Sequence, residues 1–323
     1  MKKVSILSPC YNVAKYLPKY LDSIIAQNYS PIELILVNDG STDNTAEVIN
    51  SYRDRLTENN IELKYIFKEN GGQASAVALG IKEVTGEYLI WPDPDDFLLP
   101  ESIIKRAKYL DEHPNCGIVR SNGYVYNEND LTKSIAPISK MNRTTYMEDF
   151  VSFYVPWCPG CYMVRMSCFD KANPERKIPI SSAGQNIQML LPMVFYYPCR
   201  YLDEYLFGYV IHPNSHSHSI NTYEKNKGHL KTLKSLVEDT LEVINDDTSK
   251  YLNLNRKFFR TSFYRNAWNF GERTEMQNFE SELRENNEFN IEHLIMKHLK
   301  KTSFSNLAVR LIIKIKRGKN YEI

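Results

Sequence analysis

Three carboxylates that follow a short apolar run are the residues of this chain best suited to chemistry. Asp93, Asp95 and Asp96 come directly after Tyr88–Trp91, within GEYLIWPDPDDFLLP. Acids clustered at the end of a strand can hold a divalent cation together with the oxygens of a diphosphate, which indicates nucleotide-sugar chemistry. A solvated loop, or the N-cap of a helix that starts near Pro100, is the plainer interpretation of the same residues.

Several other sites are excluded by spacing. An EF-hand loop beginning at Asp93 would have Leu98 at its sixth position and Ile104 at its twelfth, where glycine and glutamate are needed. The chain has neither GxxxxGK[ST] nor GxGxxG, so a nucleotide site would lack a glycine-rich phosphate loop. A metal would then carry the phosphate charge.

The sequence Cys158-Pro159-Gly160-Cys161 has the spacing of a thioredoxin-type redox motif. Such a motif opens a helix, whereas the residues that follow, Tyr162–Val164, predict a strand. We therefore interpret it as a turn with two ordinary thiols. A zinc site is not expected, because no second CxxC or pair of histidines completes the ligand set.

Composition describes an ordinary folded protein of 323 residues, with 42% hydrophobic residues, 24% charged residues and a net charge of +1. This charge does not favour nucleic-acid binding. The N-terminal apolar stretch is too short for a signal peptide, and no window has the length of a membrane span. Six scattered cysteines are not typical of a secreted disulfide scaffold, so we expect a protein of the reducing cytoplasm.

Apolar runs and helical periodicity alternate through the first third of the chain. A helix is expected over residues 13–25, with Asn12 as its cap, and another over 74–84. The expected strands are Val4–Ser8, Glu33–Val37, Glu62–Phe67 and Tyr88–Trp91. This alternation predicts a parallel sheet with helices on both faces.

Polar segments follow each of the expected strands. They are residues 8–12, 38–43, 70–73 and 93–96. Asp39-Gly40 and Asn70-Gly71-Gly72 are each good turn signals, and neither would indicate a site alone. Because ligands of parallel α/β sheets bind beyond the carboxyl ends of the strands, we expect the four loops to meet in one crevice.

The first 105 residues or so resemble the family 2 glycosyltransferases of the GT-A fold. The segments that carry the resemblance are SILSPCYNVAKYLPKYLDSIIAQNY, ELILVNDGSTDNTAEVI, NGGQASAVALGI and GEYLIWPDPDDFLLPESI. The resemblance implies an α/β, Rossmann-like, mostly parallel sheet flanked by helices, with a helical C-terminal extension. The expected GT-A domain is 1–220, divided into a nucleotide-sugar half (1–115) and an acceptor half (116–220), and the helical region is 221–323.

The resemblance also implies roles for the residues at the strand ends. Pro9 and Tyr11 would frame the nucleotide pocket, and Asp39 would accept a hydrogen bond from uracil N3. The Gly-Gly segment, with Asn70 and Gly71, would contribute to the same pocket.

The acids would form the family's DxD-type motif. Asp95 is the expected ligand of Mn²⁺ or Mg²⁺, and Asp93 is expected on the ribose or sugar side. Asp96 would contact the metal or the donor sugar.

The chain departs from the family pattern at its expected general base. In that segment Gln185 and Asn186 stand where a carboxylate is usual, and an amide cannot accept a proton at neutral pH. We interpret both as holding the acceptor, with a helix cap as the alternative. The family's arginine in the Gly-Gly segment is also replaced, by Val77.

The segment YVIHPNSHSH offers other candidates for a base or a diphosphate contact. We expect His216, with His218 beside it, to contact the diphosphate or the metal, and less readily to act as the base. Two exposed loop histidines are the alternative. Asp203 and Glu204 are expected to lie in a structural turn.

The end of the chain predicts a helix with an apolar stripe on one face and basic residues on another. Residues 297–319 contain eight Lys or Arg and no acid, and residues 303–323 have an apolar stripe at helical spacing. A helix of this kind can lie on an anionic membrane surface or pack on the protein itself. A lipid-linked acceptor would favour peripheral contact with the inner face of the cell membrane.

The resulting expectation is a metal-dependent inverting glycosyltransferase. It would move a sugar from a nucleotide-sugar, UDP-linked by preference, to a glycan or lipid-linked saccharide in cell-surface polysaccharide synthesis. One alternative is a catalytically silent GT-A-like protein that binds nucleotide-sugar or glycan. A second is a sugar-phosphate nucleotidyltransferase, against which the missing glycine- and lysine-bearing N-terminal loop counts.

Overall fold

The computed structural model describes residues 1–182, 184–212 and 222–298. The chain forms two compact units, one of residues 1–215 and 235–251 and the other of residues 216–234 and 252–323. The first unit contains the sheet and the second is helical, so the expected α/β fold with a helical C-terminal region is confirmed. The domain boundaries expected from the sequence stay a prediction.

The sheet has nine strands in the order β3-β2-β1-β4-β8-β6-β9-β5, with β7 paired to β6. The pairs β3/β2, β2/β1, β1/β4 and β6/β9 are parallel, and the remaining pairs are antiparallel. The strands are β1 (Val4–Cys10), β2 (Ile32–Asp39), β3 (Ile61–Lys68), β4 (Tyr88–Ile90), β5 (Phe97–Leu98), β6 (Ile118–Asn127), β7 (Asp130–Pro137), β8 (Tyr162–Arg165) and β9 (Arg200–Ile211).

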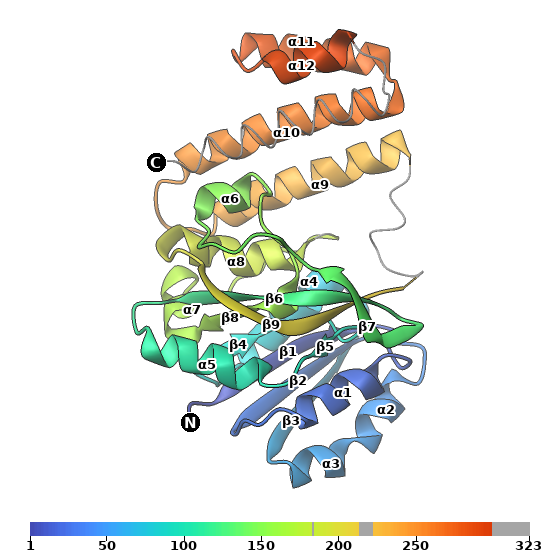
Figure 1. Cartoon of the computed structure of the whole chain (residues 1–323), viewed down its shortest axis with the longest axis vertical. Helices are drawn as coiled ribbons and strands as arrows, with labels where there is room; N and C mark the ends of the chain where they lie inside the picture. The colour runs from blue at the N-terminus through green and yellow to red at the C-terminus, as the bar shows by residue number, and fades with distance from the viewer. Residues whose placement is uncertain (183, 213–221, 299–323) are drawn as a thin grey trace. The chain divides into compact units, whose positions relative to one another are not determined.

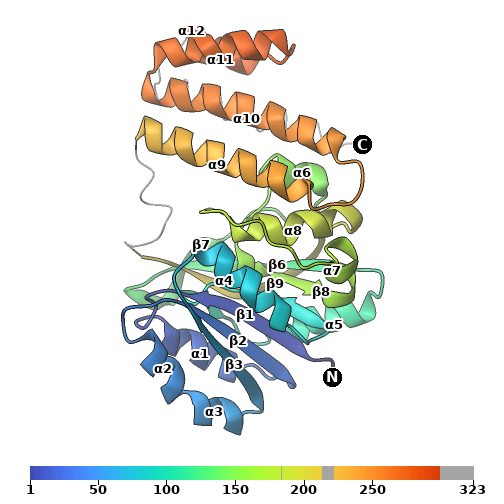
Figure 2. The ribbon, with the colours of Figure 1, turned by 180° about the vertical axis from the view of Figure 1, so that it is seen from behind.

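Helices cover both faces of the sheet, which is why β1 and β2 are buried along their whole length. α1 and α5 lie on the near face in Figure 1, and α4 and α7 lie on the near face in Figure 2. The helices of this unit are α1 (Leu17–Ile25), α2 (Thr45–Ser51), α3 (Arg53–Glu58), α4 (Gln73–Gly80), α5 (Ser102–Glu112), α6 (Met147–Val151), α7 (Met166–Ala172) and α8 (Gln185–Tyr196), with short 3-10 turns at η1 (Ile81–Glu83) and η2 (Pro159–Cys161).

The start of α1 differs from the expectation. Asn12 does not cap this helix, because it lies five residues before Leu17 in a left-handed conformation with a φ of 52°. Its side-chain oxygen instead accepts a hydrogen bond of 2.8 Å from the backbone N–H of Thr42. Asn12 thereby joins the loop after β1 to the loop after β2.

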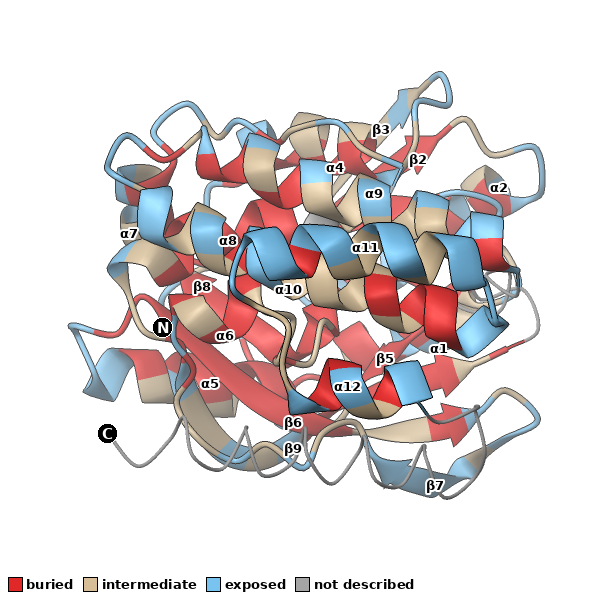
Figure 3. Ribbon diagram, turned by 90° about the horizontal axis from the view of Figure 1, so that it is seen from above, coloured by how far each residue is buried: buried red, intermediate tan, exposed pale blue. Residues whose placement is uncertain are grey.

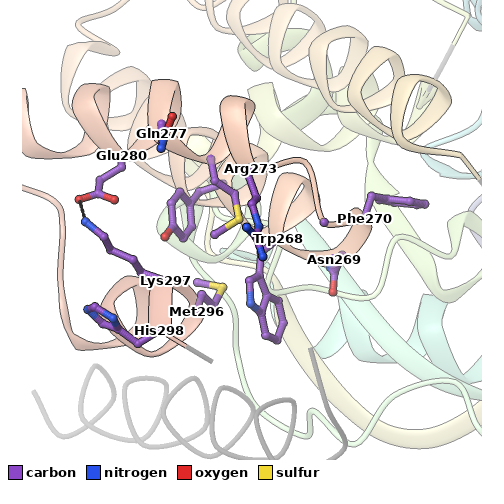
Figure 4. Close-up of a pocket in the computed structure, with 12 residues that line it drawn as sticks. Trp268, Asn269, Phe270, Arg273, Gln277, Glu280, Met296, Lys297 and His298 are labelled. Atoms are coloured by element: carbon purple, nitrogen blue, oxygen red, sulfur yellow. Dashed lines mark hydrogen bonds and ion pairs between the residues drawn. The ribbon is translucent and has the colours of Figure 1, made fainter. Parts of the chain in front are cut away.

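The remaining described residues form four helices, α9 (Tyr223–Leu241), α10 (Ser249–Phe270), α11 (Arg273–Glu285) and α12 (Ile291–His298). In the helical unit Tyr264, Trp268, Leu283 and Met296 form a small core. A pocket of about 730 Å³ lies within this unit, lined by residues of α10, α11 and α12 (Figure 4). Buried residues are concentrated in the central strands, whereas β7 and much of α11 are exposed (Figure 3).

No helix within the described residues is long and apolar enough to cross a membrane. The basic segment 303–323, for which we expected membrane contact, lies outside the described residues.

A buried carboxylate ties the N-terminal strands together. Glu33 is fully buried on β2 and accepts hydrogen bonds from Ser5 on β1 (2.5 Å) and from the backbone and side chain of Thr85 (2.9 and 2.8 Å). It also forms an ion pair of 2.6 Å with Lys64 on β3. Burial alone would raise the pKa of Glu33, but hydrogen bonds from Lys64, Ser5 and Thr85 outweigh burial and lower that pKa to about 2.

Glu33→Gln should lower the free energy of unfolding by about 3 kcal/mol at pH 7. The folded pKa is depressed, so the contribution of the carboxylate is fully present above the ordinary pKa of 4.5 and is lost as the pH falls toward about 2. Urea unfolding of both proteins at pH 7 and near pH 3 measures this. A difference between them that does not shrink with falling pH would contradict the assignment.

Candidate active site

The last residue of β2, Asp39, is the first residue of the candidate site. Asp39 is 2% exposed, and its carboxylate accepts hydrogen bonds from the backbone N–H groups of Gly71 (3.0 Å) and Gly72 (2.8 Å). Lys68, its neighbour on β3, forms an ion pair with it at 2.5 Å. A carboxylate has about four lone-pair sites, so three of these contacts leave one acceptor position for a ligand.

The loop after β3 is drawn against the end of β2 at a glycine. Gly40 has a φ of +71°, and a Cβ there would lie 2.7 Å from the backbone nitrogen of Asn70. Only glycine combines this left-handed conformation with so close an approach. Asn70 and Gly71, both exposed, are therefore brought beside Asp39, as the sequence predicts.

The acids after β4 divide into two accessible groups and one buried group. Asp93 accepts a hydrogen bond of 2.7 Å from the side chain of Gln73, at the start of α4. The side chain of Asp95 is 32% exposed and lies 2.9 Å from Nε2 of His212. Asp96 is 2% exposed, and its carboxyl accepts a hydrogen bond of 2.8 Å from the backbone N–H of Val210.

Burial raises the pKa of Asp96 well above its ordinary value, and the charges of Asp95 and Asp93 raise it further. A carboxyl so placed holds the end of β9 against the loop after β4. Its expected contact with a metal or donor sugar stays a prediction.

His212 is the residue of the site that the sequence analysis missed. It follows β9 directly, is 6% exposed, and its ring lies 4.8 Å from the ring of Tyr16, between centroids. The antiparallel pairing of Phe97 with Gly208 brings the end of β9 alongside the acids. His212 stands in the histidine-bearing segment that the sequence singled out, whereas the preferred His216 lies outside the described residues.

Asn186, at the start of α8, is held at both ends of its side-chain amide. Its oxygen accepts a hydrogen bond from the indole N–H of Trp91 (2.9 Å), and its nitrogen donates one to the carbonyl oxygen of Trp157 (2.9 Å). The amide thus links the end of β4 to the turn before β8. Gly184, in a left-handed conformation with a φ of 69°, precedes the helix.

Other expected residues are placed as follows. Pro9 is buried in β1, and Tyr11, just past that strand, is 50% exposed. Val77, which replaces the family's arginine, is completely buried in α4 and cannot reach a diphosphate. The side chain of Gln185 is not among those described.

Asp203 and Glu204 do not form the expected turn. Both lie within β9 (Arg200–Ile211), because this segment pairs in parallel with β6. Glu204 forms an ion pair of 3.2 Å with Lys105 of α5.

A divalent cation fits these residues in part. Mn²⁺ binds carboxylate oxygen and can also bind imidazole nitrogen. Asp95 and His212 offer one of each, and their Oδ2 and Nε2 atoms lie 2.9 Å apart. Within residues 1–182, 184–212 and 222–298, no group of three His, Cys, Asp or Glu side chains converges as a complete metal cage. In nucleotide sites Mg²⁺ is usually bound by one or two carboxylates of the protein, and oxygens of the substrate phosphates complete its coordination.

The chain is similar in sequence and in fold to known glycosyltransferases. The family model described as glycosyl transferase family 2 matches residues 5–171, a little over half of the chain. A glycosyltransferase of Rickettsia typhi is 40% identical over 121 residues, which are 38% of this chain and 36% of the relative. The chain thus spans little more than a third of that protein.

Two solved structures share the fold. TarS 1-349 of S. aureus, in complex with UDP-GlcNAc, has a TM-score of 0.62 at 18% identity and covers 86% of this chain and 79% of its own. Mannosyltransferase PcManGT of Pyrobaculum calidifontis, in complex with GDP-Man and Mn²⁺, has a TM-score of 0.53 at 13% identity, covering 91% and 77%.

Removal of the Asn186 amide should destabilise the protein. Asn186→Ala leaves the indole N–H of the buried Trp91 without its acceptor, and we expect a loss of about 1–3 kcal/mol in the free energy of unfolding. Trp91→Phe should make the loss from Asn186→Ala smaller, because the donor is then absent. Asn142→Ala, at an exposed asparagine, serves as the control. Stability is measured by urea unfolding. Losses that simply add in the double variant would contradict an energetic contribution from the hydrogen bond between Trp91 and Asn186.

Proposed function

The chain belongs to glycosyl transferase family 2, and we propose that it transfers a sugar from a UDP-sugar to an acceptor hydroxyl with inversion at the anomeric carbon and dependence on a divalent metal. The observation that carries this proposal is the meeting of Asp39, Asp93 and Asp95 at one edge of a parallel sheet, inside the region matched by the family model. We place the acceptor among glycans or lipid-linked saccharides of cell-surface polysaccharide synthesis, as the family resemblance implies.

The nucleotide would bind across the ends of β1 and β2. Tyr11 follows β1, and the pairing of Cys10 with Asn38 brings it beside the end of β2. Its half-exposed ring can stack on a base, and the open acceptor position of Asp39 suits the N3–H of uracil. The stacking by Tyr11 and the hydrogen bond to Asp39 are both supported by the position of these residues at the ends of adjacent strands.

The diphosphate would lie over the loop after β4. Asp95 would hold the cation, with His212 beside it, and Asp93 would face the ribose or sugar. A bound Mn²⁺ or Mg²⁺ stabilises the negative charge that develops on a departing nucleoside diphosphate. Because position 77 is a valine, the chain offers no arginine there to share that task.

Asn186 positions the acceptor side of this site and does not take the acceptor's proton. Its amide oxygen already accepts from Trp91, and an amide is not basic at neutral pH. Asn186 therefore acts by fixing the turn at Trp157 against the end of β4. The proton goes to another group.

Asp95→Asn should abolish Mn²⁺-dependent sugar release from a UDP-sugar while leaving the fold intact, because the amide replaces the expected cation ligand. His212→Gln should lower that release by about 10- to 100-fold, as loss of a partner of a metal ligand does. The measurement is release of free sugar from a panel of UDP-sugars with and without Mn²⁺, at matched thermal stability.

Asp203→Asn, at an exposed acid of β9, is the matched control and should leave the release unchanged. Undiminished release by Asp95→Asn would remove the metal-ligand role. UDP binding by the wild type without release from any donor, even with candidate acceptors added, would favour the alternative of a binding protein.

A further inference from the structure

The two cysteines at residues 158 and 161 form a buried pair that the proposed transfer reaction does not use. Cys158 is 8% exposed and Cys161 is 1% exposed. They stand at either end of a tight turn, in which the backbone N–H of Cys161 donates to the carbonyl oxygen of Cys158 at 3.2 Å. Side chains three residues apart in a 3-10 turn, as these two are, lie on the same side of the turn. The turn thus places two sulfur atoms next to one another inside the protein.

Two fully buried arginines approach the same turn. Arg106 of α5 is 0% exposed and donates to the carbonyl oxygens of Gly160 (2.8 Å) and Tyr162 (3.3 Å), the residues on either side of Cys161. Arg120 of β6 is 1% exposed and stands opposite Tyr162 in the sheet. Nε of Arg106, and Nε and Nη1 of Arg120, have no hydrogen-bond partner in the described structure.

Neither arginine has a carboxylate partner within the part of the chain that the structure describes. Burial lowers the pKa of Arg106 only to about 10, so its guanidinium stays charged at neutral pH. A buried charge without a counter-charge is costly. The ionisable groups that favour the charged form of Arg106 are the thiols of Cys161 and Cys158.

The two thiols are not equivalent. The hydrogen bond from Cys158 lowers the pKa of Cys161, and the charges of Arg106 and Arg120 lower it as well. Burial raises the pKa of Cys158 well above its ordinary value, and the charges of Asp96 and Asp93 act in the same direction. These are the charged groups that face the pair from α5, β6 and the loop after β4.

We propose that Cys158 and Cys161 are a peroxide-reactive dithiol, in which Cys161, in the turn that the buried guanidinium groups of Arg106 and Arg120 approach, is the attacking sulfur and Cys158 is the thiol that closes the disulfide. This site is independent of the transfer reaction proposed above. It differs from a thioredoxin-type site, because the turn leads into β8 and not into a helix.

Formation of the disulfide requires two steps and consumes one molecule of hydrogen peroxide. The Cys161 thiolate attacks one peroxide oxygen, the O–O bond breaks, and hydroxide leaves and takes a proton from solvent, so that Cys161 becomes a sulfenic acid. The Cys158 sulfur then attacks the Cys161 sulfur, the S–O bond breaks, and the departing hydroxide takes the proton of Cys158. The two sulfurs lose two electrons in all, and one hydrogen peroxide becomes two waters.

The disulfide would close beside the candidate active site. Trp157, which precedes Cys158, supplies the carbonyl oxygen that accepts the hydrogen bond from Asn186. A change of geometry in this turn therefore acts on a contact that also includes Trp91 and the end of β4.

The test is mass spectrometry of the full chain, reduced, freed of reductant and treated with hydrogen peroxide. After denaturation and labelling with N-ethylmaleimide, the untreated protein should carry a label on each of its six cysteines. The treated protein should carry two fewer, with the loss mapped to a Cys158–Cys161 peptide lighter by two hydrogens, and dithiothreitol should restore both labels. Full labelling after treatment, or loss at other cysteines, would overturn the proposal.

Variants assign the two roles. In Cys158→Ser, dimedone should trap a sulfenic acid at Cys161, and in Cys161→Ser the remaining Cys158 should not react. The reverse pattern would overturn the assignment of the thiolate.

A variant that keeps both cysteines tests the arginines. Arg120→Gln should slow disulfide formation about tenfold at neutral pH, the effect of a one-unit rise in the pKa of the attacking thiol. Arg53→Gln, at an exposed arginine of α3, is the control and should react at the wild-type rate. An unchanged rate in Arg120→Gln would remove the arginine from the site.

Discussion

The parallel pairing of β3, β2, β1 and β4 forces the residues that follow these strands to a single edge of the sheet. Side chains far apart in the sequence become neighbours there because each chain segment must leave its strand at the same edge. The carboxylate of Asp39 already accepts hydrogen bonds from the backbone N–H groups of Gly71 and Gly72 in this way. The loops are thus joined before any ligand binds, and such preorganisation lowers the entropic cost of binding.

Much of this edge could be predicted from the sequence. Short apolar runs that end in Asn-Asp-Gly, Asn-Gly-Gly and Asp-rich loops identify four strands and their turns by local chemistry alone. The second half of the sheet could not be predicted in the same way. There β8 pairs with β4 and β6, and β5 pairs with β9, so the partners are set by packing between distant segments and not by any local pattern.

The side chains that the sequence analysis missed are those whose partners depend on these distant pairings. His212 meets Asp95 because β9 runs antiparallel to β5. Trp91 and Trp157 explain why an asparagine can stand at position 186, since its amide both accepts and donates, which a carboxylate cannot do. The residue that looks like a lost base in the sequence is, in the structure, one whose amide makes two hydrogen bonds.

The electrostatics of the acids and of the cysteine turn are connected. Burial raises the pKa of Asp96 well above its ordinary value, and the charges of its neighbours Asp95 and Asp93 raise it further. Burial raises the pKa of Cys158, and the charges of Asp96 and Asp93 raise it further. Interaction with Cys158 lowers the pKa of Cys161, and the charges of the two buried arginines lower it as well. The acids and the two guanidinium groups therefore shift the pKa values of the two thiols in opposite directions, upward for Cys158 and downward for Cys161.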